Sequence, residues 1–217
     1  FRSCRSIACA DAEQSLYPRA RRILAEVREA SAAIEADDTA GGMLRIGAIP
    51  TMAPYLLPAA LKRFRRDRPA ARFTVREDLT PRLVEAVIEC ELDCAVMSAP
   101  IEHDLIELET IGEEPLLVAT SAKEPPPHRG PWKLDDLRDR PTVVLHEMHC
   151  LGQQIQSFCS AQRVAQRIVC RTTQLATVLE LVALGLGVSL VPKMCADHDR
   201  TKSRDYAPLG AAGPKRA

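Results

Sequence analysis

Short apolar runs alternate with amphipathic segments through most of the chain from Met43 onward. Strands are expected at residues 44–49, 73–78 and 94–99, and helices at residues 54–69 and 80–92 between them. This strand–helix–strand–helix–strand order is typical of a parallel sheet with covering helices. The sequence therefore predicts an α/β unit that begins near Met43.

A second α/β set follows a proline-rich connection at residues 123–131. Its expected strands and helices alternate at residues 142–147, 150–162, 167–172, 173–187 and 188–192. Two more strands are expected before the connection, at 105–111 and 114–121, whereas the tail 193–217 has no convincing periodicity. Two such sets in tandem predict a bilobed domain with a cleft, in which ligands bind beyond the carboxyl ends of strands.

A different periodicity precedes Met43. Apolar side chains recur there at intervals of three and four residues, and we call them the heptad residues: Leu16, Ala20, Ile23, Val27, Ala30 and Ile34. Arg and Glu flank this stripe, which predicts a helix of roughly 20 residues that serves as a dimer contact rather than a core helix. The segment "DDTAGG" at 37–42 is expected to end the helix and form a linker.

Composition narrows the possible functions. The net charge is zero, with 29 Lys and Arg against 29 Asp and Glu, so a globally basic surface cannot be the basis of nucleic-acid binding. No apolar run approaches the roughly 20 residues of a membrane span, and no signal peptide is recognisable. Without secretion, the eight cysteines are expected to be reduced, and most of them, Cys90 and Cys94 included, to be buried packing.

The stretch "VVLHEMHCLGQQIQSFCSAQ" holds the most unusual chemistry. Cys150 follows His149 at an expected helix N-terminus, where free backbone N–H groups stabilise a thiolate, and Cys159 lies nine residues further along. Nine helical residues rise about 13–14 Å, whereas a disulfide needs Cα atoms within about 7 Å. If the two thiols pair on oxidation, the helix must unwind. Chance placement of two cysteines, or a metal site with His146, are the alternatives.

Several segments resemble a known family. "RSIACADAEQSLYPRARRILAEV" resembles the end of the winged helix-turn-helix and the linker helix of LysR-type transcriptional regulators. "LRIGAIPTMAPYLLP", "LDCAV" and "VALGLGVSLVP" resemble their effector-binding domain, which has the type 2 periplasmic-binding-protein fold. Together these segments cover nearly the whole chain. Within the family, "IPTMAPYLLP" and "HCLGQQIQSFC" resemble the OxyR subgroup of hydrogen-peroxide sensors. This match is specific, because ordinary members of the family lack the cysteine pair.

The resemblance implies roles for individual residues. Cys150 matches the peroxidatic cysteine and Cys159 the resolving one, and their disulfide would be the switch. Thr51, Thr80 and His149 match the residues that line the peroxide pocket, although either threonine could instead cap the helix that follows it.

The sequence also departs from the subgroup. Met148 stands where a glycine usually precedes the His–Cys pair, and Gln153 replaces an acidic residue that helps proton transfer. Arg2 and Arg5 match the wing, which touches the DNA backbone.

The expected organisation follows from this resemblance. The predicted parts are a winged helix-turn-helix remnant at 1–12, a linker helix at 13–38, regulatory subdomain I at 43–120, subdomain II at 121–207 and a truncated return segment at 208–217. The chain lacks an initiator Met, so we expect it to begin inside a longer gene product.

The favoured hypothesis is a cytoplasmic, homodimeric or homotetrameric regulator that binds DNA, senses hydrogen peroxide and contacts RNA polymerase. No enzyme activity, cofactor, metal or membrane contact is expected. One alternative is a LysR-type regulator that answers to a small effector bound between the lobes, without redox sensing. The other is a binding protein or thiol-dependent enzyme on the same bilobed fold.

Overall fold

The computed structural model describes the chain almost continuously from Gly42 and only partly before it. The described residues are 16–17, 19–20, 23–24, 26–27, 30, 42–124, 127–128, 130–138, 140–210 and 213–217. The predicted helix-turn-helix remnant at 1–12, with Arg2 and Arg5, lies outside them, as does the heptad residue Ile34.

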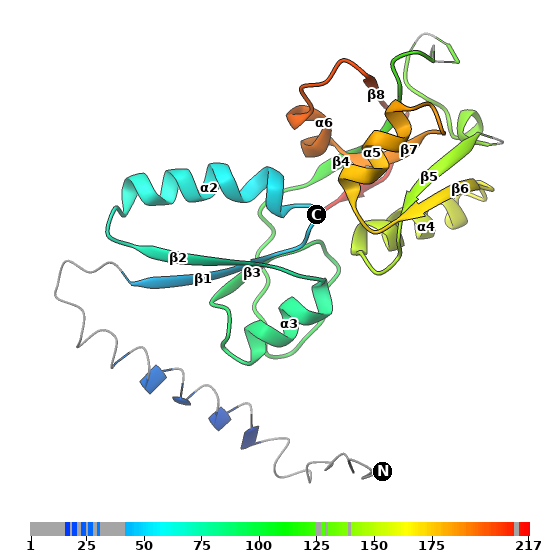
Figure 1. The fold of residues 1–217 in the computed structure, drawn as a ribbon. Coiled ribbons are helices and arrows are strands. Elements are labelled where there is room, and N and C mark those ends of the chain that lie inside the picture. The colour runs from blue at the N-terminus through cyan, green and yellow to red at the C-terminus, as the bar shows by residue number, and fades with distance from the viewer. Residues whose placement is uncertain are drawn as a thin grey trace, which may run out of the picture.

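The first lobe is a parallel three-stranded sheet between two helices (Figure 1). Its elements are β1 (Met43–Ala48), α2 (Ala53–Asp67), β2 (Arg72–Glu77), α3 (Thr80–Ile88) and β3 (Cys94–Val96), with the strands in the order β2-β1-β3. α2 and α3 cover opposite faces of the sheet. Gly47 keeps the α3 face close, because a Cβ there would lie 2.6 Å from Leu92 and 2.7 Å from Leu83. The predicted strand–helix alternation is confirmed throughout this lobe.

The second lobe is built around β4 and a parallel pair of strands. Its elements are β4 (Glu114–Ser121), η1 (Leu134–Leu137), β5 (Pro141–Leu145), α4 (Cys150–Ala161), β6 (Arg167–Thr172), α5 (Leu175–Ala183), β7 (Ser189–Pro192), α6 (Lys193–His198), β8 (Arg204–Pro208) and β9 (Lys215–Arg216). β4 lies between β7 and β8, both antiparallel to it, and also pairs with β9. β5 and β6 run parallel, with α4 between them in the chain. The predicted bilobed α/β fold is confirmed.

Three details differ from the sequence prediction. Residues 105–111 form no strand, and Leu105, Leu108 and Ile111 are each more than half exposed, because no described strand pairs with this segment. The tail predicted to be aperiodic contains α6, β8 and β9, which are too short to show a period and are held by pairing with β4 or by packing. β4, placed by prediction in the subdomain ending at residue 120, joins the sheet of the second lobe.

The prediction that Cys90 and Cys94 are buried packing is wrong. Cys94 is exposed at the start of β3. Cys90 is half-buried just after α3, with a φ of 55°, a left-handed conformation that often ends a helix. These two positions serve a helix-to-strand turn at the surface rather than the core.

The heptad residues that the structure describes are helical, and most of them are exposed. Leu16, Ile23 and Val27 are 63%, 60% and 55% exposed. Apolar side chains at this spacing, left uncovered by their own chain, are typical of a helix that packs against another copy. The dimer contact stays a prediction. No helix in the described part of the chain combines the length and the apolar character of a membrane span.

Candidate functional site

The site is organised by the turn between β5 and α4. His149 is the N-cap of α4, in extended conformation, and Cys150 is the first helical residue. The amide N–H of His146 donates to Thr172 O at 2.8 Å, and that of His149 donates to His146 O at 3.1 Å. A Cβ on Gly152 would lie 2.5 Å from His146 O, so only glycine lets the first turn of α4 lie this close to the strand end. The thiol of Cys150 is thereby fixed at a helix N-terminus, as predicted.

Cys150 lies at the junction of the two lobes. It is half-buried and packs against a core cluster of the first lobe: Ile49, Met52, Leu83, Ala86 and Leu92. Because this cluster belongs to the other lobe, any displacement of Cys150 changes a contact between lobes. Cys150 is the first residue of α4, where the backbone N–H groups have no partner within the helix.

The two predicted pocket threonines border the same cluster. Thr51 lies between Ile49 and Met52 and is 1% exposed, and Thr80 begins α3, three residues before Leu83. The capping role considered for both is wrong: the N-caps are Met52 for α2 and Leu79 for α3, and neither Thr51 nor Thr80 occupies a cap position. The Oγ1 atom of Thr80 is buried and has no hydrogen-bond partner among the described residues. A small hydrogen-bonding molecule would satisfy it.

Thr51 is held by a buried arginine that no sequence pattern predicted. Arg216 Nη1 donates to Thr51 Oγ1 at 3.1 Å, and Nη2 donates to Thr51 O at 3.2 Å. The same guanidinium pairs with Glu114, whose other carboxylate oxygen accepts from the N–H of Met194 at 2.8 Å. Because Oγ1 of Thr51 accepts from this cation, its hydroxyl proton is left available to donate to another group.

Cys159 lies in different surroundings from Cys150. It is 3% exposed and belongs to the core cluster of the second lobe, and burial raises the pKa of its thiol. Both cysteines are free, and α4 is intact from one to the other. The structure therefore places the two thiols on one helix but does not bring them together.

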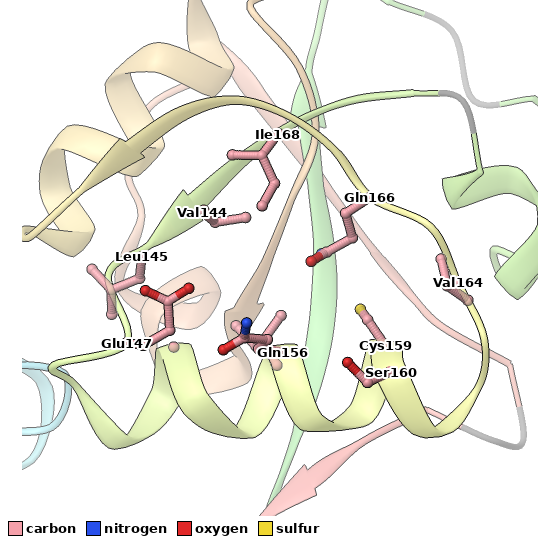
Figure 2. Close-up of a pocket in the computed structure, with 11 residues that line it drawn as sticks. Val144, Leu145, Glu147, Gln156, Cys159, Ser160, Val164, Gln166 and Ile168 are labelled. Carbon is pink, nitrogen blue, oxygen red and sulfur yellow. The ribbon is translucent and has the colours of Figure 1, made fainter.

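A pocket of about 210 Å³ opens beside Cys159, between α4 and β6. Figure 2 shows Cys159 pointing from α4 into this space, towards the side where Gln166 and Ile168 lie. Ser160 and Gln156 also line the pocket. The surroundings of Cys159 are thus less tightly packed than its low exposure alone would indicate.

Burial lowers the pKa of His149, with a further lowering from His146, while a hydrogen bond to the Thr173 backbone and the charge of Glu77 oppose the shift. The imidazole is therefore neutral at neutral pH.

The described residues hold no group of three or more His, Cys, Asp and Glu side chains arranged for a metal ion. His146, His149 and Cys150 therefore do not form such a group.

The lowered pKa of His149 predicts that the stability of the chain depends on pH. Below its usual pKa of 6.5 the unfolded chain binds a proton that the folded chain does not, so stability should fall as pH drops from 6.5 towards the folded pKa. We expect the free energy of unfolding to decrease between about pH 7.5 and about pH 5.5 more in the native chain than in His149→Gln. Urea unfolding measures this, with the exposed His103→Gln as control. Equal losses in all three chains would contradict the prediction.

Comparison with known proteins places this site in context. The family model described as the LysR substrate binding domain matches residues 37–216. The chain is 29% identical to the hydrogen peroxide-inducible genes activator of Pectobacterium carotovorum subsp. carotovorum, covering 99% of this chain and 72% of that protein. It is 28% identical to the DNA-binding transcriptional dual regulator OxyR of Escherichia coli (strain K12), covering 99% and 71%.

Solved structures give the same result for the fold. The reduced regulatory domain of OxyR2 from Vibrio vulnificus matches with a TM-score of 0.72 and 29% identity, over 83% of this chain and 87% of that one. A full-length OxyR variant from Pseudomonas aeruginosa matches with a TM-score of 0.78 over 100% of this chain and 71% of that one. At 22% identity, the second match supports the fold alone.

Proposed function

Because the chain belongs to the family of LysR substrate-binding domains, we propose that it is the sensing part of a LysR-type transcriptional regulator that responds to hydrogen peroxide through Cys150 and Cys159. One observation carries the proposal: two free thiols lie on one intact helix, the first against the core of the other lobe and the second inside the core of its own. Joining them must rearrange both cores.

The chemistry proceeds in two steps. The thiolate of Cys150 attacks one oxygen of hydrogen peroxide, the O–O bond breaks, and a sulfenic acid and hydroxide form. The thiol of Cys159 then attacks the sulfenic sulfur, the S–O bond breaks, and the disulfide forms with release of water. Two electrons leave the two thiols, and with the protons released they convert one peroxide into two waters.

The residues around Cys150 suit the first step. Cys150 lies at the N-terminus of α4, where backbone N–H groups without a helical partner can donate to an anion. The hydroxyl of Thr51, oriented by Arg216, and that of Thr80, which lacks a described partner, can donate to the peroxide oxygens. His149 stays neutral because burial lowers its pKa, so its ring can accept a proton as well as donate one.

The second step requires α4 to unwind. The separation of nine residues corresponds to about 13–14 Å along the helix, against about 7 Å for the Cα atoms of a disulfide. Cys150 must leave the first-lobe cluster and Cys159 the second-lobe core. The pocket beside Cys159 lowers the cost of the second movement, because fewer contacts are lost where packing is already incomplete. The contact between the lobes then changes, and this change is the structural response to oxidation.

The remaining roles follow from the family and lie beyond the described residues or beyond this chain alone. Arg2 and Arg5 would contact the DNA backbone, and the heptad residues would join two copies. A homodimer or homotetramer would bind DNA, and RNA polymerase would be its partner at the promoter.

Peroxide titration of the reduced chain tests the proposal. We expect a Cys150–Cys159 disulfide to form, with close to one peroxide consumed per chain. Mass spectrometry of unreduced peptides detects the disulfide-linked pair. Far-UV circular dichroism should show the loss of roughly one short helix at the same peroxide concentration, since α4 has only 12 residues. If all the thiols oxidise slowly and without preference for this pair, the redox proposal fails, and a small effector bound between the lobes becomes the favoured function.

A further inference from the structure

A glutamine on α4 reaches out of its own lobe. Gln154 Nε2 donates to Ser98 Oγ at 2.8 Å and to Ala99 O at 2.8 Å. Ser98 and Ala99 lie two and three residues after the end of β3, where the chain leaves the first lobe and passes toward β4. The side chain therefore ties the helix between the two cysteines to the connection between the lobes.

The same point is bonded to the C-terminal end of the described chain. Ser98 Oγ donates to Ala217 O at 3.1 Å, and the N–H of Ala99 donates to the same oxygen at 3.0 Å. Ala217 follows β9, which pairs with the first residues of β4. Figure 1 shows this end of the chain lying between the two lobes. Gln154 thus contacts a small network that joins the connection between the lobes to Ala217.

Gln154 also lies between the two cysteines on α4. It lies four residues after Cys150 and five before Cys159. Any unwinding that brings those two thiols within disulfide distance must displace it. The bonds to Ser98 and Ala99 form with the helix intact, and we expect them to break when it unwinds.

The amide is only half satisfied. Its Oε1 is buried without a hydrogen-bond partner in the described part of the chain, although its Nε2 makes two bonds. A buried acceptor without a partner opposes the arrangement that buries it. The contact is therefore one that can be released when the helix changes, rather than a rigid brace.

We infer that Gln154 is a latch that transmits the redox state of α4 to the connection between the lobes. The inference rests on the proposed function and adds how oxidation of the two thiols would reach the connection between the lobes. In the reduced chain the latch holds Ser98 and Ala99 against Ala217. Formation of the disulfide withdraws Gln154 and frees this network, so that the lobes can change their relative position.

Hydrogen–deuterium exchange of the peptide that contains Ser98 and Ala99 tests the latch. We expect oxidation of the native chain by hydrogen peroxide to raise exchange at Ala99 several-fold. In the reduced state, Gln154→Ala should raise it to a similar level, and Gln154→Glu should do so as well, because a carboxylate cannot donate to Ala99 O. Gln153→Ala is the matched control, since Gln153 is the exposed neighbour on the same helix, and it should exchange like the native chain. Exchange within β1 checks that each variant is folded.

The outcomes separate the latch from the proposed function. A disulfide that forms in the native chain without any change in exchange at Ala99 would overturn the latch and leave the proposed function intact. The same holds if reduced Gln154→Ala and Gln154→Glu, folded by the β1 criterion, exchange like Gln153→Ala. A native chain that forms no Cys150–Cys159 disulfide with peroxide would overturn both.

Discussion

Replacement of Cys150 by serine is expected to abolish the reaction of this site with hydrogen peroxide. Serine keeps the size and position of the side chain at the helix N-terminus, but its hydroxyl is not ionised at neutral pH and does not attack peroxide. We expect neither a sulfenic acid at position 150 nor any disulfide to Cys159 at peroxide concentrations that oxidise the native chain completely. Trapping of sulfenic acid with dimedone, followed by peptide mass spectrometry, measures the first product directly.

Two further substitutions make the result specific. Cys159→Ser should still form the sulfenic acid on Cys150 but no disulfide between these positions, because the resolving thiol is missing. Cys170→Ser is the matched control: Cys170 is a half-buried cysteine in β6 of the same lobe, and its loss should leave both products unchanged. If Cys150→Ser still forms a peroxide-dependent disulfide at Cys159, Cys150 is not the peroxide-reactive thiol.

The sequence predicted those parts of the site that depend on local structure. The strand-to-helix turn at His149–Cys150 follows from the apolar run of β5 and the amphipathic α4, and the structure places the helix start at Cys150. The separation of the two thiols follows from helix geometry alone. Both inferences need only neighbouring residues, and such short-range patterns are what a single sequence carries most strongly.

Long-range pairing could not be predicted in the same way. Arg216 contacts Thr51 across 165 positions, and Gln154 contacts Ser98 across 56. The periodic pattern of apolar positions does not indicate which distant residue a polar side chain will contact. Arg216 is fully buried, in a tail where no period was visible, and the partners that justify its burial, Glu114 and Thr51, lie in other segments. Residues 105–111 show the opposite error, since a strand-like pattern forms no strand without a neighbour to pair with.

The buried ion pair of Arg204 and Asp199 leads to the largest expected effect on stability. Both side chains are 4% exposed, and Arg204 donates to both carboxylate oxygens of Asp199, at 2.8 and 3.1 Å. Arg204→Leu would leave the Asp199 carboxylate buried without its cation. Breaking a buried pair in this way costs about 3–5 kcal/mol. We expect the free energy of unfolding in urea to fall by about that amount.

The exposed pair of Lys193 and Asp197 is the matched control for this experiment. Lys193 Nζ lies 2.6 Å from the Asp197 carboxylate, but the two side chains are 50% and 55% exposed. Lys193→Leu should therefore change stability by less than about 1 kcal/mol. In Asp199→Leu combined with Arg204→Leu, no charge is left unpaired within the pair, so much of the loss should be recovered. A double variant as unstable as Arg204→Leu alone would show that lost packing, not an unpaired charge, causes the effect.

The same pair sets how stability depends on acid. Burial alone would raise the pKa of Asp199, but hydrogen bonds from Tyr206, from the Thr201 backbone and from Arg204 outweigh it and hold the pKa well below the usual 3.8. The ionised carboxylate therefore adds stability above pH 3.8, and this contribution is lost as pH falls below that value. Arg204→Leu removes both hydrogen bonds that Arg204 donates to Asp199 and a neighbouring positive charge, which raises the pKa of Asp199. Below pH 3.8 the stability of the variant should then change less steeply with pH than that of the native chain, and parallel curves would contradict the role assigned to Arg204.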